Sequence, residues 1–328
     1  MSLTLTMEHR VWPLREAFAI SRSTATTCPT LVVTLTDGSG RQGRGEGCGV
    51  DYKGETPEGL ERQIEAVRRR IEVGVSREQL LTLMPAGGAR CAVDGALWDL
   101  EAKQTGRSAY ASAGVPCPAP VRTAFTIGIR SVDDVEVAAR ARSRHALLKL
   151  KVDAHDPVAS VMAARRGAPD AALIVDPNQA WSVAELKVLA PVLADLGVVL
   201  LEQPIPVGAE AALDGWVSPV RLCADELIDD AADLAKAQGR FGVVNIKLDK
   251  TGGLTAALGL ARAARQAGFD LMVGCMAGSS LAMAPATILA QQCEFADLDG
   301  PLLAAEDWAD GLTYRDGLIE PADARFWG

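Results

Sequence analysis

From about residue 120 onward, short apolar runs recur along the chain, and most of them end in a polar or charged residue. The runs start 22 to 27 residues apart, and alanine-rich segments with helical character separate them. Strands that alternate with helices at this interval predict βαβ units in a parallel sheet. The predicted strands are residues 124–129, 146–152, 172–178, 198–204, 220–226, 243–249, 270–275 and 295–300.

Eight such units predict a closed barrel of α/β class. No full-length helix is expected after the eighth strand, so the predicted fold is a modified TIM barrel of the form (β/α)7β. A doubly wound open sheet is the alternative, and it would need a glycine fingerprint after its first strand. The dense glycine cluster at residues 43–49 lies outside the repeating region, and we interpret it as a loop.

The first third of the chain lacks this repeat and predicts an α+β unit. Alternating residues 30–36 lead into a hairpin turn at Asp37-Gly38, and apolar spacing predicts one amphipathic helix through residues 60–71. A capping box at Ser76 and Gln79 would open a second helix, and a third is expected over about 89–103.

Prolines 116, 118 and 120 make the best candidate boundary in the chain. We therefore expect a capping domain of residues 1–118 and a barrel of residues 119–300. Residues 301–328 contain a hairpin signal at Asp316-Gly317, and we expect this tail to return to the capping domain.

The composition is that of an ordinary globular protein: 328 residues, 48% hydrophobic, with a formal net charge of −9. This acidic balance argues against a nucleic-acid partner or an anionic membrane surface. Seven scattered cysteines without a C-x-x-C pair indicate neither a disulfide framework nor a zinc knuckle. Only three histidines are present (His9, His145 and His155), so mechanisms that need several histidines are excluded.

The N-terminus does not resemble a secretory signal, because Glu8, His9 and Arg10 precede any long apolar stretch. Residues 271–293 carry no charge and are long enough to span a bilayer. Glycines, serines and Pro285 interrupt this segment, so a buried strand, a turn and a buried helix fit it better. We expect a cytoplasmic protein without a membrane partner, and the sequence leaves open whether it forms a homo-oligomer.

Three carboxylates end consecutive predicted strands: Asp176, Glu202 and Asp225. In a barrel of this type the strand ends surround the active site. Three anionic oxygen ligands without histidine or thiolate favour Mg²⁺ over zinc. Each residue alone could instead cap the following helix, but three in register favour a metal site. Glu226 and Asp249 could support the metal ligands through hydrogen bonds, or could form ion pairs.

Three lysines interrupt the same apolar strands. Lys149 and Lys151 are two residues apart and share a face, and Lys247 comes four strands later, roughly opposite in a ring of eight. A lysine with the ordinary pKa of about 10.4 is a poor base, but burial, a neighbouring ammonium and a divalent cation all lower the pKa. Salt bridges to the carboxylates are the alternative role.

Two lysines that flank a metal suggest one chemistry. A substrate carboxylate bound to Mg²⁺ could lose its α-proton to one lysine and form a metal-stabilised enediolate. The opposite lysine could then return a proton to the other face, which would invert the stereocentre.

Five strings carry a resemblance to a known family: KLKVD (149–153), DPNQAW (176–181), LLEQP (200–204), CADE (223–226) and NIKLDKTGG (245–253). They resemble the muconate-lactonizing subgroup of the enolase superfamily over nearly the whole chain. The resemblance implies a Lys151/Lys247 acid–base pair and Mg²⁺ bound by Asp176, Glu202 and Asp225.

Within this subgroup the sequence is most similar to the L-Ala-D/L-Glu epimerases, which invert the C-terminal residue of a dipeptide and act in peptidoglycan turnover. The resemblance implies that Asp297 and Asp299 in FADLDGP bind the α-ammonium group of the dipeptide, although a helix cap is the alternative. It also implies substrate contacts from Lys149 and Thr126, and from Arg22 to the glutamate side chain. Arg15 lies near Arg22 and is an alternative for that role.

The sequence departs from the family at Pro177, Ala180 and Leu227, but no ligand or base is lost. The loop 274–280 varies among members, so the preferred dipeptide stays open. Other activities on the same metal site are o-succinylbenzoate synthase, N-succinylamino acid racemase and muconate cycloisomerase. A non-catalytic barrel that only binds a ligand is the remaining alternative.

Overall fold

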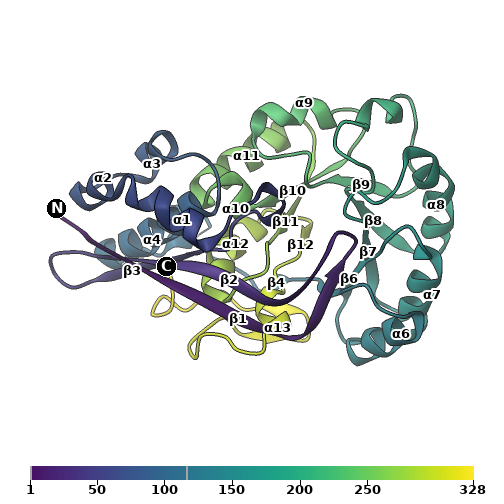
Figure 1. Cartoon of the computed structure of the whole chain (residues 1–328), viewed down its shortest axis with the longest axis horizontal. Coiled ribbons are helices and arrows are strands. Elements are labelled where there is room, and N and C mark those ends of the chain that lie inside the picture. The colour runs from purple at the N-terminus through teal and green to yellow at the C-terminus, as the bar shows by residue number, and fades with distance from the viewer. Residues whose placement is uncertain (1, 116) are drawn as a thin grey trace.

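The computed structural model describes residues 2–115 and 117–328, so Pro116 of the predicted boundary lies outside the described residues. An eight-stranded parallel sheet curls around the right-hand part of the molecule (Figure 1). Every strand of this sheet falls within a predicted apolar run. The strands are β5 (Phe125–Ile127), β6 (Leu147–Lys151), β7 (Ala172–Asp176), β8 (Val198–Glu202), β9 (Arg221–Ala224), β10 (Val243–Lys247), β11 (Asp270–Gly274) and β12 (Phe295–Ala296).

Neighbouring strands in this sheet follow the chain order from β5 to β12. The backbone nitrogen of Ala124 donates to the carbonyl oxygen of Ala296 at 2.8 Å, which brings the first and last strands together. The modified TIM barrel is therefore confirmed, and the open doubly wound sheet is not the fold of this chain.

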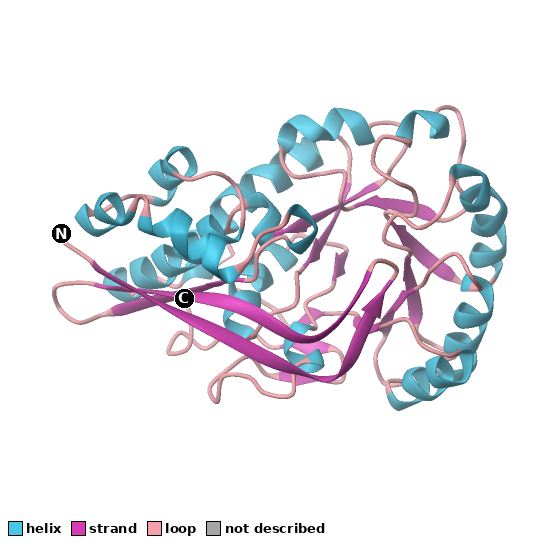
Figure 2. Ribbon diagram, in the orientation of Figure 1, coloured by secondary structure: helices cyan, strands magenta, loops and turns pink. Residues whose placement is uncertain are grey.

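Helices cover the outside of the sheet (Figure 2). They are α6 (Val132–Ala141), α7 (Pro157–Gly167), α8 (Val183–Asp195), α9 (Leu234–Ala237), α11 (Leu254–Gln266) and α12 (Ser280–Ala290). Two single-turn helices, α10 (Leu248–Thr251) and α13 (Gly300–Leu303), follow β10 and β12 and contact, respectively, α4 (Gly88–Thr105) and β1 (Thr4–Ile20) of the N-terminal unit. The eighth helix is short, as predicted. The connection after β8 differs from the expected helix. Pro204, Pro206 and Gly208 come first, and only the four-residue 3₁₀ helix η2 (Glu210–Leu213) forms after them.

The N-terminal unit pairs a three-stranded antiparallel sheet with helices. Its elements are β1 (Thr4–Ile20), β2 (Ser23–Thr36), β3 (Gln42–Gly47), the 3₁₀ helix η1 (Asp51–Lys53), α1 (Pro57–Glu65), α2 (Arg68–Val73), α3 (Arg77–Leu83), α4 (Gly88–Thr105) and α5 (Ala109–Ser112). The predicted capping box opens α3, with both of its hydrogen bonds present. The single helix expected over 60–71 is wrong, because the backbone at Val67 leaves the helical region and separates α1 from α2.

The glycine cluster is also not the predicted loop, since residues 42–47 form β3. A Cβ atom at Gly43, Gly45 or Gly47 would lie 2.1–2.2 Å from a carbonyl oxygen of α4. The strand packs directly on the helix backbone, and only glycine permits that approach. The hydrophobic pattern carries no signal for such a contact.

The hairpin formed by β1 and β2 reaches across to the C-terminal ends of the barrel strands, where its tip lies beside β6 and β7 (Figure 1). Ile129 donates its backbone N–H to Ala19 at 2.8 Å, and Ser21 Oγ donates to the carbonyl oxygen of Asn178 at 3.4 Å. The N-terminal unit therefore covers the end of the barrel where the predicted site lies.

The C-terminal tail contacts both units. The hairpin of β13 (Tyr314–Arg315) and β14 (Leu318–Ile319), at the predicted Asp316-Gly317 turn, pairs with β4 (Val121–Arg122). Gly328 N–H donates to Asp99 Oδ1 on α4 at 2.8 Å, and Trp327 Nε1 donates to the carbonyl oxygen of Arg44 at 3.0 Å. The exact domain boundaries stay a prediction.

The uncharged segment 271–293 forms β11, a turn and the buried helix α12, as expected. Within residues 2–115 and 117–328, no helix has both the length and the apolar character that crossing a bilayer requires.

Candidate active site

The alternation of side chains along the strands stacks a polar layer on an apolar layer inside the barrel. The apolar layer takes one buried residue from seven of the eight strands or their approaches: Ala124, Leu147, Ile174, Leu200, Cys223, Val243 and Met272. Two residues further along, the chain again points to the same face. The residues at these positions are Thr126, Lys149, Asp176, Glu202, Asp225, Asn245 and Gly274, and all except the glycine are polar.

The three predicted metal ligands lie side by side on β7, at the end of β8 and just after β9, and all are almost fully buried. Each of them faces an ammonium group. Lys151 Nζ lies 2.6 Å from Asp176 Oδ2, and Lys247 Nζ lies 2.7 Å from Asp225 Oδ2. The carboxylates are therefore neutralised by lysines in this structure.

Lys149 occupies the centre of this layer and is only 1% exposed. Its Nζ lies 3.0 Å from Asp176 Oδ2, 2.7 Å from Glu202 Oε2 and 2.8 Å from Asp297 Oδ2. Burial alone would lower the pKa of Lys149, but the three carboxylates outweigh burial and hold it well above the ordinary lysine value. Lys149 is therefore a fixed positive charge.

Lys247 is also surrounded by negative charge. Burial opposes its charged form, but Asp225 and Glu202 raise the pKa of Lys247 above the ordinary value. A Cβ atom at Gly274 would lie 3.1 Å from Cε of Lys247, so the glycine leaves room for this side chain. For Lys247 to act as a base, the negative charge of the carboxylates must be compensated by another cation.

The donor set fits a hard divalent cation. Glu202 Oε1 accepts a hydrogen bond from Asn245 Nδ2 at 2.9 Å, whereas Oε2 is buried and has no hydrogen-bond partner. The ammonium of Lys149 approaches Oε2 without the geometry of a hydrogen bond. Burial, with the charges of Asp176 and Asp225, raises the pKa of Glu202 to about 8. The charge of Lys149 opposes this rise in the pKa of Glu202 but does not cancel it.

Each of the three carboxylates is in contact with a lysine ammonium. Across residues 2–115 and 117–328, no three His, Cys, Asp or Glu side chains are already grouped to hold a metal ion. The fit to Mg²⁺ therefore rests on the chemistry of the donors and on Glu202 Oε2, which has no hydrogen-bond partner, since oxygen-only ligand sets suit Mg²⁺.

Asp297 and Asp299 follow β12 and contact β5, the first strand of the barrel. Thr126 links the pair, because its Oγ1 lies 3.1 Å from Asp297 Oδ1 and its backbone N–H donates to Asp299 Oδ2 at 2.5 Å. Burial favours the neutral acid at both residues, but Lys149 outweighs it and lowers the pKa of Asp297. Burial and the charge of Asp297 raise the pKa of Asp299 to about 7.

Arg22 lies at the tip of the β1–β2 hairpin. Its Nη1 is 2.8 Å from Glu226 Oε1, and its guanidinium lies 5.0 Å from the centre of the Tyr52 ring. The Oε2 atom of Glu226 is buried without a hydrogen-bond partner. Glu226 thus forms one of the ion pairs anticipated for it. Asp249 instead accepts two backbone hydrogen bonds, from Cys48 and Gly49 at 2.8 and 3.0 Å.

Sequence reasoning missed three residues of this site. Lys250 is buried, and its Nζ lies 2.7 Å from Asp225 Oδ1, so Asp225 is held between two lysines. Asn178 Oδ1 accepts a hydrogen bond from Lys151 at 3.1 Å, and Asn245 supports Glu202. Asn245 and Lys247 are two residues apart on β10 and share a face, so the alternation of side chains along a strand could have predicted Asn245.

A cavity of about 560 Å³ joins these groups. All three lysines of the prediction line it, together with Asp297, Asp299, Thr126 and Arg22. Arg15 is not among its lining residues; its Nε donates to the carbonyl oxygen of Leu302 at 3.2 Å. The cavity therefore collects every predicted site residue except the three carboxylates, which lie in contact with the lysines that line it.

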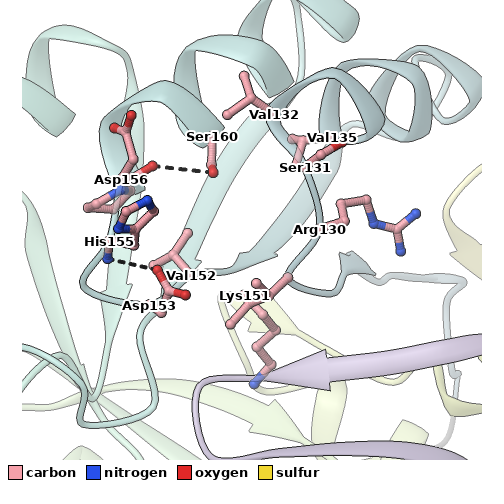
Figure 3. Close-up of a pocket in the computed structure, with 12 residues that line it drawn as sticks. Arg130, Ser131, Val132, Val135, Lys151, Val152, Asp153, His155, Asp156 and Ser160 are labelled. Carbon is pink, nitrogen blue, oxygen red and sulfur yellow. Dashed lines mark hydrogen bonds between the residues drawn. The ribbon is translucent and has the colours of Figure 1, made fainter.

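A second cavity of about 170 Å³ lies between the start of α6 and the start of α7, and Lys151 borders both cavities. Figure 3 shows the Lys151 ammonium extending away from His155 and Asp153. The backbone of His155 is held by Asp153 Oδ1 at 2.8 Å. His155 does not line the larger cavity, whereas His9 does, from β1, where its Nε2 lies 2.7 Å from Glu61 Oε2.

Comparisons of the sequence and of the structure with known proteins point to the same family. A family model described as enolase C-terminal domain-like matches residues 133–325. The L-Ala-D/L-Glu epimerase of Escherichia coli (strain K12) is 40% identical over 318 residues, covering 96% of this chain and 99% of that protein.

Two crystal structures extend the match to three dimensions. An enolase family member from Agrobacterium tumefaciens, with bound sodium and L-Ala-L-Glu, has a TM-score of 0.96 and 41% identity over 99% of this chain and 100% of its own. A dipeptide epimerase from Enterococcus faecalis V583, complexed with Mg and L-Leu-L-Tyr, has a TM-score of 0.91 and 27% identity over 98% and 97% of the two chains. The resemblance read from the strand motifs is thereby confirmed, and this chain belongs to the enolase superfamily, among relatives that are dipeptide epimerases.

Proposed function

We propose that this chain is a Mg²⁺-dependent isomerase that inverts the α-carbon of the C-terminal residue of a dipeptide, with L-Ala-L-Glu and L-Ala-D-Glu as substrates. The observation that carries the proposal is the placement of Lys151 and Lys247. They end β6 and β10, three strands lie between them in the sheet, and both line one cavity.

The lysines divide the proton transfer between two faces of the substrate. The neutral amine of one lysine takes the proton from the α-carbon, and the electron pair of the broken C–H bond moves into the adjacent carboxylate. The ammonium of the other lysine then donates a proton to the opposite face of that carbon. The reverse reaction uses the same groups in exchanged roles, so no oxidant or other reactant is consumed.

Asp176, Glu202 and Asp225 would hold Mg²⁺, which supplies positive charge beside the substrate carboxylate and favours removal of the α-proton. Lys149 lies among the same carboxylates and keeps its charge, so it would bind the substrate carboxylate rather than transfer protons. Lys250 and Asn245, neither of which lines the cavity, would hold Asp225 and Glu202 in place through their hydrogen bonds.

The two ends of the cavity would orient the dipeptide. Asp297 and Asp299 would bind the α-ammonium group of the first residue, because two carboxylates on one strand end form a cation pocket. Arg22 would bind the side-chain carboxylate of glutamate, and it would share its charge with Glu226. A substrate held at both ends presents its second α-carbon between the two lysines.

Deuterium uptake tests the proposal directly. The protein is incubated with L-Ala-L-Glu and Mg²⁺ in D₂O, and the products are separated and analysed by mass spectrometry. We expect L-Ala-D-Glu with one deuterium at the glutamate α-carbon. An intact L-Ala-L-Glu without deuterium, in a protein shown to bind Mg²⁺, would contradict the proposal.

A further inference from the structure

Part of the cavity lining is aliphatic. Four side chains line it there: Leu14 from β1, Met276 and Ala277 from the loop after β11, and Leu303 from α13. We name these four residues the aliphatic wall. Each is partly exposed, and each borders the cavity that contains the lysines.

The aliphatic wall lies next to the Asp297/Asp299 pair. Leu303 donates its backbone N–H to the carbonyl oxygen of Asp299 at 3.2 Å, so α13 leaves directly from the pair. Leu14 lies beside the same helix, because it forms an isolated antiparallel bridge with Ala304.

The loop that carries the remaining wall residues is held against the same place. A Cβ atom at Gly300 would lie 2.7 Å from the carbonyl oxygen of Gly278 and about as close to Ala277. Cys48 Sγ donates to the carbonyl oxygen of Ala277 at 3.3 Å, which ties the loop to the capping unit. The wall is therefore built by packing from three elements.

The titratable side chains of β1 that line the cavity are already paired. His9 Nε2 lies 2.7 Å from Glu61 Oε2, and Arg10 Nε lies 2.8 Å from Glu8 Oε1. The four wall side chains carry no polar group, and Asp297 and Asp299 would be occupied by the α-ammonium of the substrate. A charged substrate side chain at the aliphatic wall would therefore lose water without gaining a partner, which is unfavourable. An aliphatic side chain there would bury apolar surface, which is favourable.

In a dipeptide the α-ammonium and the first side chain are attached to the same carbon. When Asp297 and Asp299 hold the ammonium, the first side chain must therefore lie within reach of the aliphatic wall. Building on the proposed function, we propose that this site selects dipeptides whose N-terminal residue has an aliphatic side chain larger than alanine, such as leucine or methionine. The alanine methyl group alone would leave much of the wall uncovered.

Kinetics with matched dipeptides test this selectivity. L-Ala-L-Glu, L-Leu-L-Glu and L-Lys-L-Glu are compared in the presence of Mg²⁺, with kcat/KM as the readout. We expect L-Leu-L-Glu to be at least as good as L-Ala-L-Glu, and L-Lys-L-Glu to be at least tenfold worse than L-Leu-L-Glu. A Leu-to-Ala ratio below one, or an equal rate with the lysine dipeptide, would overturn the proposal.

Variants locate the effect. Leu303→Ser places a hydroxyl in the wall and should lower the Leu-to-Ala ratio about tenfold, because one buried methylene can change specificity by roughly that factor. Leu318→Ser is the matched control, because Leu318 is exposed on β14 and does not line the cavity. Leu14→Ser repeats the test if Leu303→Ser does not fold. An unchanged ratio in the folded wall variants would also overturn the proposal.

The two proposals fail in different ways. If L-Ala-L-Glu is epimerised and L-Leu-L-Glu is not, the function stands and the aliphatic wall does not select its substrate. If neither dipeptide is epimerised, the proposed function fails, and calorimetric binding of the same two dipeptides then decides whether the wall prefers leucine.

Discussion

Lys149 and Asp297 form an ion pair of 2.8 Å that joins β6 to the end of β12 inside the barrel. The pair leaves Asp297 charged, because Lys149 lowers its pKa in spite of burial. The carboxylate of Asp297, which would bind the α-ammonium of the dipeptide, is thus fixed in position by Lys149, and this lysine is only 1% exposed.

Asp297→Asn should separate a dipeptide epimerase from a lyase or cycloisomerase. Loss of the carboxylate removes a charged hydrogen bond to the ammonium, so kcat/KM for L-Ala-L-Glu should fall roughly 100-fold, about 2.7 kcal/mol. The substrates of o-succinylbenzoate synthase and muconate cycloisomerase have no α-ammonium group. If L-Ala-L-Glu turnover is unchanged in Asp297→Asn, the assigned role of this residue is wrong.

Arg22→Met should change the choice of the second residue. Arg22 pairs with Glu226 at 2.8 Å, and its loss removes the positive charge that would meet a glutamate side chain. We expect kcat/KM for L-Ala-L-Glu to fall at least tenfold, while L-Ala-L-Leu changes less than threefold, since about 1.4 kcal/mol corresponds to tenfold. An equal loss for both dipeptides would indicate that Arg22 supports the fold rather than glutamate binding.

Removal of divalent cations should abolish epimerisation and lower stability. Glu202 Oε2 is buried without a hydrogen-bond partner, so a bound cation stabilises the folded state at this point. At a Mg²⁺ concentration 100 times the Kd, the free energy of unfolding should rise by about 2.7 kcal/mol. Thermal unfolding with EDTA and with excess Mg²⁺ measures this, and Glu202→Gln should reduce the difference. A melting temperature that does not respond to Mg²⁺ would count against the site.

Asp94 on α4 should make stability depend on pH in the unusual direction. It is fully buried, it accepts hydrogen bonds from the backbone and side chain of Thr255, and burial raises its pKa to about 6. Because the folded state holds this proton above pH 4 and the unfolded state does not, stability is greatest at low pH and falls as pH rises through 6. Between pH 5 and 7 this amounts to about 1.4 kcal/mol.

Asp94→Asn removes that titration and leaves the other buried acids in place. The free energy of unfolding of the variant, relative to the original protein, should therefore improve by about 1.4 kcal/mol from pH 5 to pH 7. Chemical denaturation at the two pH values measures the change. A constant difference would mean that Asp94 is ionised throughout this range.

The strands and the polar layer could be predicted because one rule generates both. A period of two in a parallel strand places Ile174 and Asp176 on the same face, and equivalent positions on β8 and β9 repeat the arrangement. Lysine and carboxylate positions in register then meet at one end of the barrel. This inference needs only the spacing of residues along the chain.

Other contacts depend on tertiary packing that spacing does not encode. Lys250 lies on a single helical turn after β10, so its contact with Asp225 depends on how that turn folds back. Arg22 and Glu226 are 204 residues apart and meet only because the β1–β2 hairpin covers the barrel. The glycine cluster at Gly43 is predicted to be a loop because the contact of this strand with a helix is made by backbone atoms. Such a contact needs no hydrophobic side chains, so the sequence pattern does not show it.

The central claim is that Lys151 and Lys247 serve opposite faces of one carbon, and stereospecific exchange in D₂O tests it most directly. Lys151→Ala and Lys247→Ala should each lower epimerisation by about 10²–10⁴-fold, the usual contribution of general acid–base catalysis. Each variant should still exchange the α-proton of one diastereomer, either L-Ala-L-Glu or L-Ala-D-Glu, and the two variants should exchange opposite ones. Exchange of the same diastereomer by both variants, or full epimerisation by either, would contradict the two-lysine mechanism.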